Sequence, residues 1–199
     1  MLTDKEGEEL VKLARASIKS MFEDENDVIK QISEKYKIKK GVFITLHRYD
    51  TKELRGCIGF PYPVLKLGKA VVEAAKAAAF SDPRFPPISK KELNNITIEL
   101  SVLTEPREIK KSVKGEIVDD IRVGKDGLIV KLGPFSGLLL PQVAEEQKWN
   151  ALELIENTCL KAGLQKDAWK KSKCKTYKFQ AQIFYETYPG GKIVEKKNY

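Results

Sequence analysis

The sequence predicts an α+β fold in which a mainly antiparallel sheet is flanked by helices. Segments with helical apolar spacing and segments that alternate apolar and polar residues are interspersed along the chain. They do not form the regular strand–helix–strand repeats that are typical of a parallel sheet. The 199 residues, 42% of them hydrophobic, are enough for one domain or for two small lobes that share a core.

The helices are predicted from their caps and their apolar spacing. Thr3-x-x-Glu6 is a capping box, and Leu10, Leu13 and Ile18 then follow at helical spacing. Further helices are expected at Val28–Tyr36, at the alanine-rich segment Val64–Phe80, after a second capping box at Ser89-x-x-Glu92, and at Ala151–Leu164.

The strands are predicted from alternation and from turn residues. They are expected at Gly41–His47, Glu53–Gly59, Ile96–Thr104 and Thr176–Thr187, the first two forming a hairpin. Lys125-Asp126-Gly127 predicts another hairpin, because Asp-Gly accepts positive φ. A further turn is expected at Gly133–Gly137, and the polar segment 189–199 is expected to be a mobile tail.

The register of the first hairpin decides which of its side chains meet. If Thr45 lies opposite Cys57, then His47 lies opposite Arg55. These four side chains and Phe43 then share one face of the sheet. A shift of one residue would separate the thiol from the imidazole.

The charges and apolar runs indicate a soluble, cytoplasmic protein without a membrane partner. No apolar run approaches the roughly 18–20 residues that a membrane span needs, and the polar, acidic start is unlike a signal peptide. The chain is basic, with a net charge of +8, and ten lysines stand against three acidic residues between Lys161 and Tyr199. That asymmetry fits an acidic partner or a nucleic acid, but a solvated lysine face is the commoner explanation of such a pattern.

Metal and cofactor sites are not expected from this sequence. The three cysteines are widely spaced and His47 is the single histidine, which argues against a disulfide framework and a multi-histidine metal site. The chain has neither a phosphate-binding Gly-x-x-x-x-Gly-Lys loop nor a dinucleotide fingerprint, so we expect no cofactor.

The hexapeptide Leu54-Arg55-Gly56-Cys57-Ile58-Gly59 places an arginine two residues from a thiol. A cation near Cys57 can lower the pKa of its thiol and make it a nucleophile, with Arg55 as that cation and His47 as a base. The alternative is that Cys57 is a small buried hydrophobe at a packing point, because free cysteine is among the most buried residue types.

The segment Ser81-Asp82-Pro83-Arg84-Phe85-Pro86-Pro87 predicts a stiff loop that contains a charge pair. In one interpretation the loop presents Arg84 to an anion while Asp82 holds it. In the other, the two residues form an internal ion pair or turn cap that locks the loop. Because guanidinium groups suit carboxylates and phosphates, Arg55 and Arg84 together favour anion binding.

The basic C-terminal segment interleaves Lys173, Lys175 and Lys178 with aromatic residues. That pattern can bind RNA or another single-stranded nucleic acid. The alternative is that strand alternation directs Tyr177 and Phe179 inward and the lysines to solvent.

Seven separated motifs occur in an order that is similar to the AMMECR family, the Alport syndrome, mental retardation, midface hypoplasia and elliptocytosis chromosomal region proteins. They are Gly41–Leu46, Leu54–Gly59, Asp82–Pro87, Ile98–Leu103, Gly127–Val130, Gly137–Ala144 and Thr158–Leu164, within a resemblance from about Thr3 to Glu186. One departure is Phe60-Pro61-Tyr62-Pro63, where a small polar residue is expected after Gly59; it bears on access to the thiol.

The resemblance implies one domain over residues 1–199, made of two unequal lobes, in a cytoplasmic prokaryotic protein. It also implies an association with radical-SAM proteins and with a protein similar to mediator of cell motility. It does not name a reaction, so whether the chain is an enzyme stays open.

Three hypotheses follow from the residues and the resemblance. The first is a binding or adaptor protein with a cleft near Arg55, Asp82 and Arg84 for an anionic small molecule or a partner in an RNA- or radical-chemistry pathway. The second is an enzyme that uses Cys57 as nucleophile, and the third is an RNA-binding protein that acts through the C-terminal lysines.

Overall fold

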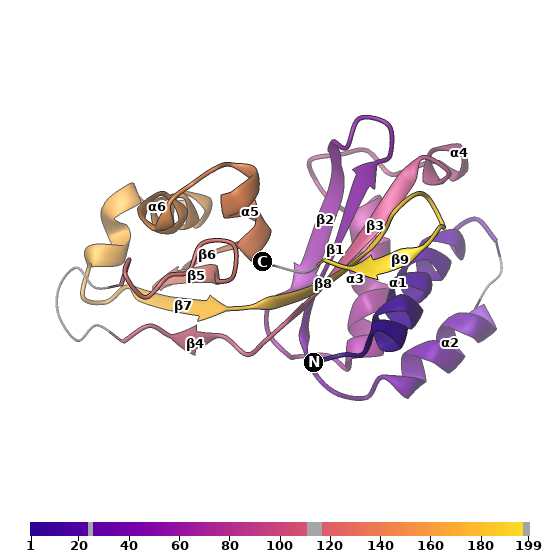
Figure 1. Cartoon of the computed structure of the whole chain (residues 1–199), viewed down its shortest axis with the longest axis horizontal. Coiled ribbons are helices and arrows are strands. Elements are labelled where there is room, and N and C mark those ends of the chain that lie inside the picture. The colour runs from indigo at the N-terminus through magenta and orange to yellow at the C-terminus, as the bar shows by residue number, and fades with distance from the viewer. Residues whose placement is uncertain (24–25, 111–116, 197–199) are drawn as a thin grey trace. The chain divides into compact units, whose positions relative to one another are not determined.

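The computed structural model describes residues 1–23, 26–110 and 117–196, and the chain divides into two compact units. Residues 1–103 and 182–196 form unit 1, and residues 104–181 form unit 2. Each unit combines helices with a sheet of antiparallel strands, which confirms the α+β class (Figure 1).

The sheet of unit 1 has the strand order β2-β1-β3-β8-β9. Its strands are β1 (Gly41–Arg48), β2 (Leu54–Phe60), β3 (Ile96–Leu103), β8 (Ala181–Glu186) and β9 (Ile193–Glu195). β1 lies between β2 and β3 and pairs antiparallel with both. The segment that the sequence predicts as a mobile tail contributes the edge strand β9, which pairs with β8.

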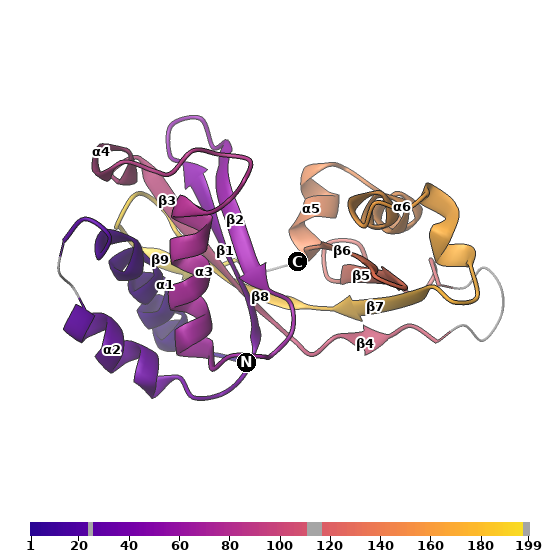
Figure 2. The same ribbon diagram turned by 180° about the vertical axis from the view of Figure 1, so that it is seen from behind.

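Helices cover one face of this sheet. They are α1 (Asp4–Lys19), α2 (Asn26–Lys35), α3 (Leu67–Phe80) and α4 (Lys90–Leu93), and Figure 2 shows α1 and α3 along the strands with α2 beside them. The predicted capping box at Thr3 and Glu6 is formed at the start of α1. Alternate residues of β1, such as Val42, Ile44 and Leu46, point into the core that these helices close.

Unit 2 contains a four-stranded sheet in the order β4-β7-β5-β6. Its elements are β4 (Arg107–Glu108), β5 (Gly127–Leu132), β6 (Phe135–Leu139), α5 (Pro141–Glu146), α6 (Ala151–Lys161), the 3₁₀ helix η1 (Lys166–Lys170) and β7 (Lys175–Phe179). Side chains of β5, α6 and η1 form its own core, among them Leu128, Val130 and Ile155. Among the helices of the described ranges, none has the length and apolar character to cross a membrane.

The hairpin predicted at Asp126-Gly127 is wrong. The residues before Asp126 form turns, and β5 begins only at Gly127. The Asp126 carboxylate accepts the backbone N–H of Arg122 at 3.0 Å, so the aspartate caps its own preceding turn. The hairpin lies instead between β5 and β6, at the predicted turn where Gly133 has a φ of +58°.

The single strand predicted over Thr176–Thr187 is divided at Gln180. β7 belongs to the sheet of unit 2 and β8 to that of unit 1. At the break the Thr104 N–H donates to the Gln180 carbonyl, and the Gln180 N–H donates to Thr104 Oγ1, both at 2.9 Å. Alternation continues through the break, so it gives no sign of the change of sheet.

Candidate functional site

The outer edge of β2 is closed by a loop at Cys57. Thr45 lies opposite Cys57, as predicted, and the Cys57 backbone groups face away from β1. The Cys57 N–H donates to Asp82 Oδ2 at 2.8 Å, and the Cys57 carbonyl accepts from Arg84 Nη2 at 3.4 Å. The segment that follows α3 therefore occupies the place of a neighbouring strand; Figure 2 shows it passing beside β2.

The pairing of β1 with β2 shifts between Leu46 and His47. His47 lies opposite Leu54, and Arg55 is left as the extra residue of a bulge. The predicted pairing of His47 with Arg55 is therefore wrong. A bulge re-aims the side chain that it carries, and here the Arg55 side chain is only 3% exposed.

The guanidinium of Arg55 is bound by a carboxylate and a carbonyl. Its Nε donates to Glu92 Oε1 at 2.7 Å, and its Nη2 donates to Glu92 Oε2 at 3.2 Å and to the Pro86 carbonyl at 2.8 Å. Its Nη1 is buried without a hydrogen-bond partner in the described part of the chain. These contacts direct Arg55 to α4 and the loop, and none of them is to the Cys57 thiol.

Glu92 lies between two arginines. It also forms an ion pair with Arg48 at 3.2 Å. Burial alone would raise the pKa of the Glu92 carboxyl, but the guanidinium groups of Arg55 and Arg48 outweigh it, and the pKa is lowered. The second capping box is consequently half formed: Ser89 Oγ accepts the Glu92 N–H, while the Glu92 carboxylate binds Arg55.

Asp82 is a buried carboxylate that holds a half-exposed guanidinium. Its side chain is 2% exposed, whereas that of Arg84 is 48% exposed. Asp82 accepts from Arg84 Nε at 3.0 Å, from Arg84 Nη2 at 2.7 Å and from the Arg84 N–H at 3.1 Å. The side chain of Arg84, together with the Cys57 N–H, holds the pKa of Asp82 well below its usual range.

These residues form one cluster of five charged groups, which we call the arginine cluster: Arg48, Arg55, Arg84, Asp82 and Glu92. Phe85 joins its two halves, because the Arg55 and Arg84 guanidinium carbons lie 5.7 and 5.4 Å from the centre of its ring. Three guanidinium groups face two carboxylates, so the cluster has one excess positive charge. Sequence reasoning missed Arg48 and Glu92; the only signal for Glu92 was its place in the capping box.

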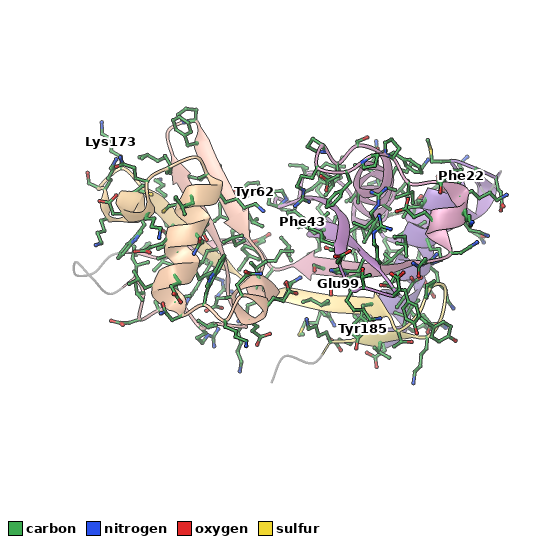
Figure 3. The ribbon with its side chains drawn as sticks, turned by 90° about the horizontal axis from the view of Figure 1, so that it is seen from above. Phe22, Phe43, Tyr62, Glu99, Lys173 and Tyr185 are labelled. Atoms are coloured by element: carbon green, nitrogen blue, oxygen red, sulfur yellow. The ribbon has the colours of Figure 1, made fainter. Side chains whose placement is uncertain are left out.

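The thiol of Cys57 lies on the sheet face opposite the helices. Its Sγ is 3.3 Å from Thr45 Oγ1, which donates to it, and the residue is half-buried. Phe43 and Glu99, labelled in Figure 3, belong to the same face by the register of β1 and β3. The pKa of the Arg84 guanidinium is raised by Asp82 and, less strongly, by Cys57, so Arg84 is a cation close to this thiol. The roles of Cys57, Arg55 and His47 in catalysis stay predictions.

The three C-terminal lysines have separate surroundings. Lys175 lies opposite Lys131 in the β5–β7 pair, and Lys178 Nζ lies 3.0 Å from Asp120 Oδ1. Lys173 is exposed and projects outward (Figure 3). Their binding of nucleic acid stays a prediction. Within the ranges that the structure describes, no group of three or more His, Cys, Asp or Glu side chains is placed to hold a metal ion.

Comparison with known proteins places these motifs in a family. The model of the AMMECR1 family matches residues 11–184. The protein MJ0810 of Methanocaldococcus jannaschii is 46% identical over 197 residues, which cover 99% of this chain and 98% of that protein. The protein PF1979 of Pyrococcus furiosus is 46% identical over 200 residues, with 98% of this chain and 95% of that protein covered.

The same relationship is seen in three dimensions. The crystal structure of the uncharacterized protein PH0010 from Pyrococcus horikoshii superposes with a TM-score of 0.89 and 43% sequence identity, and 98% of each chain is covered. The match in sequence spans both units, and so does the match in structure. The chain therefore belongs to the AMMECR1 family.

Proposed function

We propose that this protein is a binding protein that recognises a carboxylate or phosphate group through Arg84. The observation that carries the proposal is the holding of the half-exposed Arg84 guanidinium by the buried Asp82 carboxylate. Such a guanidinium is oriented before any ligand arrives, so less conformational entropy is lost on binding. Because Nε and Nη2 donate to Asp82, Nη1 supplies the donors that Arg84 can direct to a ligand.

The charge of the surrounding cluster supports an anionic ligand. Asp82 compensates Arg84, and Glu92 compensates only one of Arg48 and Arg55. Phe85 is within cation–π distance of both Arg55 and Arg84, so the Arg48–Glu92–Arg55 group, which carries the excess charge, adjoins Arg84 through Phe85. The anion is that of a small molecule, or an acidic side chain of a partner protein in the radical-SAM-linked pathway that the family resemblance implies.

In this proposal Cys57 contributes its backbone rather than its thiol. Its N–H and carbonyl bind Asp82 and Arg84, and its sulfur accepts from Thr45 Oγ1. Arg55, the cation expected to activate the thiol, binds Glu92 instead. The cation that interacts electrostatically with Cys57 is Arg84, whose pKa is raised by Asp82 first and also by Cys57.

Isothermal titration calorimetry with pyrophosphate and with citrate in a chloride buffer tests the proposal. We expect saturable binding that weakens about tenfold in Arg84→Gln and only partly in Arg84→Lys, because lysine keeps the charge but loses the orientation that Asp82 gives the guanidinium. The matched control is Arg122→Gln, which removes another exposed arginine held by a buried aspartate. Equal affinities in wild type, Arg84→Gln and Arg122→Gln would contradict the proposal. If only an acidic peptide binds at Arg84, the ligand is a partner protein.

A further inference from the structure

A second recess lies entirely within unit 1, between α2 and the start of α3. Its volume is about 440 Å³, and it shares no residue with the arginine cluster. Its rim carries Lys37, Lys66 and Lys69, and apolar atoms of Ile29 and Val72 contribute to its wall. We call it the lysine groove.

Backbone hydrogen bonds hold together the two segments that carry the lysines. The Leu67 N–H donates to the Ile38 carbonyl at 2.7 Å, and the Gly68 N–H donates to the Tyr36 carbonyl at 3.1 Å. The segment that contains Lys37 is thereby docked on the first turn of α3, next to Lys66 and Lys69 (Figure 2). The groove is built into the packing of the two helices rather than formed by loose surface side chains.

Gly68 makes this docking possible. A Cβ at Gly68 would lie 2.1 Å from the Ser33 carbonyl oxygen, so any side chain would push α2 away from α3. The close approach brings the C-terminal end of α2, and with it Ser33 and Glu34, against the first turn of α3.

The charges of the groove are not balanced. Of the lining residues that the structure describes, Glu34 is the one acidic residue. Among the described residues, Lys37, Lys66 and Lys69 take part in no ion pair, whereas Lys12, Lys35 and Lys90 of the same unit do. The first turn of α3 contains no acidic residue either, and a helix N-terminus adds partial positive charge. Three ammonium groups around one concavity give it a positive potential that favours an anion.

We propose that the lysine groove binds a small phosphate-bearing molecule whose remaining part rests on Ile29 and Val72. The three ammonium groups supply donors to phosphate oxygens, and the apolar wall gives a nonpolar moiety a surface to cover. The volume lies within the range of about 300–1,000 Å³ that is common for small-molecule sites. The site is independent of anion recognition at Arg84.

The test uses adenosine 5′-monophosphate, adenosine and inorganic phosphate as probes, followed by ¹H–¹⁵N NMR of the full chain. We expect the monophosphate to shift the amide signals of Gly68, Lys69 and Val72. The monophosphate should bind more tightly than inorganic phosphate, and adenosine should bind at least tenfold more weakly than the monophosphate. The combined variant Lys37→Gln/Lys66→Gln/Lys69→Gln should lose about tenfold or more in affinity. All three lysines are exposed, so the fold should be retained.

The matched control is Lys91→Gln/Lys125→Gln/Lys161→Gln, which removes three exposed lysines elsewhere. It should bind the monophosphate like wild type. Equal weakening in the two triple variants would show a general charge effect and overturn the proposal, as would amide shifts that avoid α2 and α3. A further variant, Val72→Ser, should weaken the monophosphate and leave inorganic phosphate unchanged. Tighter binding of a short single-stranded RNA than of the monophosphate would assign the groove to nucleic acid instead.

Discussion

The buried carboxylate of Asp82 accepts the backbone N–H of Cys57 at 2.8 Å. With its remaining contacts the same carboxylate holds the guanidinium of Arg84. One side chain therefore closes the free edge of β2 and orients the group that we propose to bind an anion. Loss of Asp82 should affect both stability and binding. Loss of Arg84 should weaken binding and also cost some stability, because the buried Asp82 carboxylate loses its counter-charge.

Asp82→Asn should reduce the free energy of unfolding by about 2–3 kcal/mol, because charge-assisted hydrogen bonds to Arg84 and to the Cys57 N–H are weakened in a buried place. Arg84→Gln should cost about 1–2 kcal/mol, because it removes the counter-charge of the buried Asp82 carboxylate, which keeps the Cys57 N–H as a donor. Urea unfolding followed by circular dichroism measures both. A larger loss for Arg84→Gln than for Asp82→Asn would contradict the assigned roles.

The stability should fall in acid through Asp82 and Glu92. The pKa of each carboxyl is lowered in the folded protein. Unfolded carboxyls protonate near about pH 4, so unfolding takes up protons below about pH 5 and the free energy of unfolding drops as the pH falls toward about 2. In Asp82→Asn this dependence should be shallower. Parallel curves for wild type and variant from pH 6 to pH 2.5 would show that Asp82 is not linked to folding in this way.

Gly56 should not tolerate a side chain. A Cβ at Gly56 would lie 2.2 Å from the backbone oxygen of Ala78 in α3, so Gly56→Ala should destabilise by about 3 kcal/mol. Ala78→Gly should not rescue it, because the obstructing atom belongs to the backbone. The comparison is Gly163→Ala, which meets no atom within 4 Å but has a φ of +74° and should cost about 1–2 kcal/mol through backbone strain. Thermal unfolding should rank the two in that order; the reverse order would contradict the close approach of β2 to α3.

Glu92→Gln should be more damaging than Arg48→Gln. It would leave the Arg55 guanidinium, 3% exposed, without its counter-charge, and we expect a loss of about 3 kcal/mol. Arg48 is 40% exposed, and its removal should cost less than about 1 kcal/mol. Chemical unfolding of both variants measures the difference. Similar losses of stability in the two variants would mean that Glu92 stabilises the fold mainly through its ion pair with Arg48.

Alternation predicts the strands at β1, β2 and β3, while the register that pairs Thr45 with Cys57 is one of the alternatives that the sequence leaves open. Sequence reasoning missed the bulge at Arg55, since a bulge depends on where an arginine finds its partner and not on the local pattern. That partner, Glu92, lies 37 residues away along the chain. The pairing of Asp82 with Arg84 was within reach because the two are neighbours in a loop stiffened by proline, whereas the contact from Asp82 to Cys57 needs the fold.

The predicted hairpin at Asp126-Gly127 failed for a related reason. The dipeptide is a turn signal, but Asp126 uses its carboxylate on the N–H of Arg122 and on the Gln180 amide. A side chain that has a better partner in the folded chain overrides the local preference. The lysine groove likewise needs two helices and a glycine contact, none of which a local pattern reports.

The most direct test of the account is the rate at which iodoacetamide alkylates Cys57 in the native protein at pH 7, read by peptide mass spectrometry. In the proposed function Arg84 recognises the ligand and Cys57 serves through its backbone. We therefore expect native Cys57 to react no faster than the same cysteine in the urea-unfolded chain, in wild type and in Arg84→Gln alike. Much faster alkylation of native Cys57 than of unfolded Cys57 would contradict this and indicate an activated nucleophile.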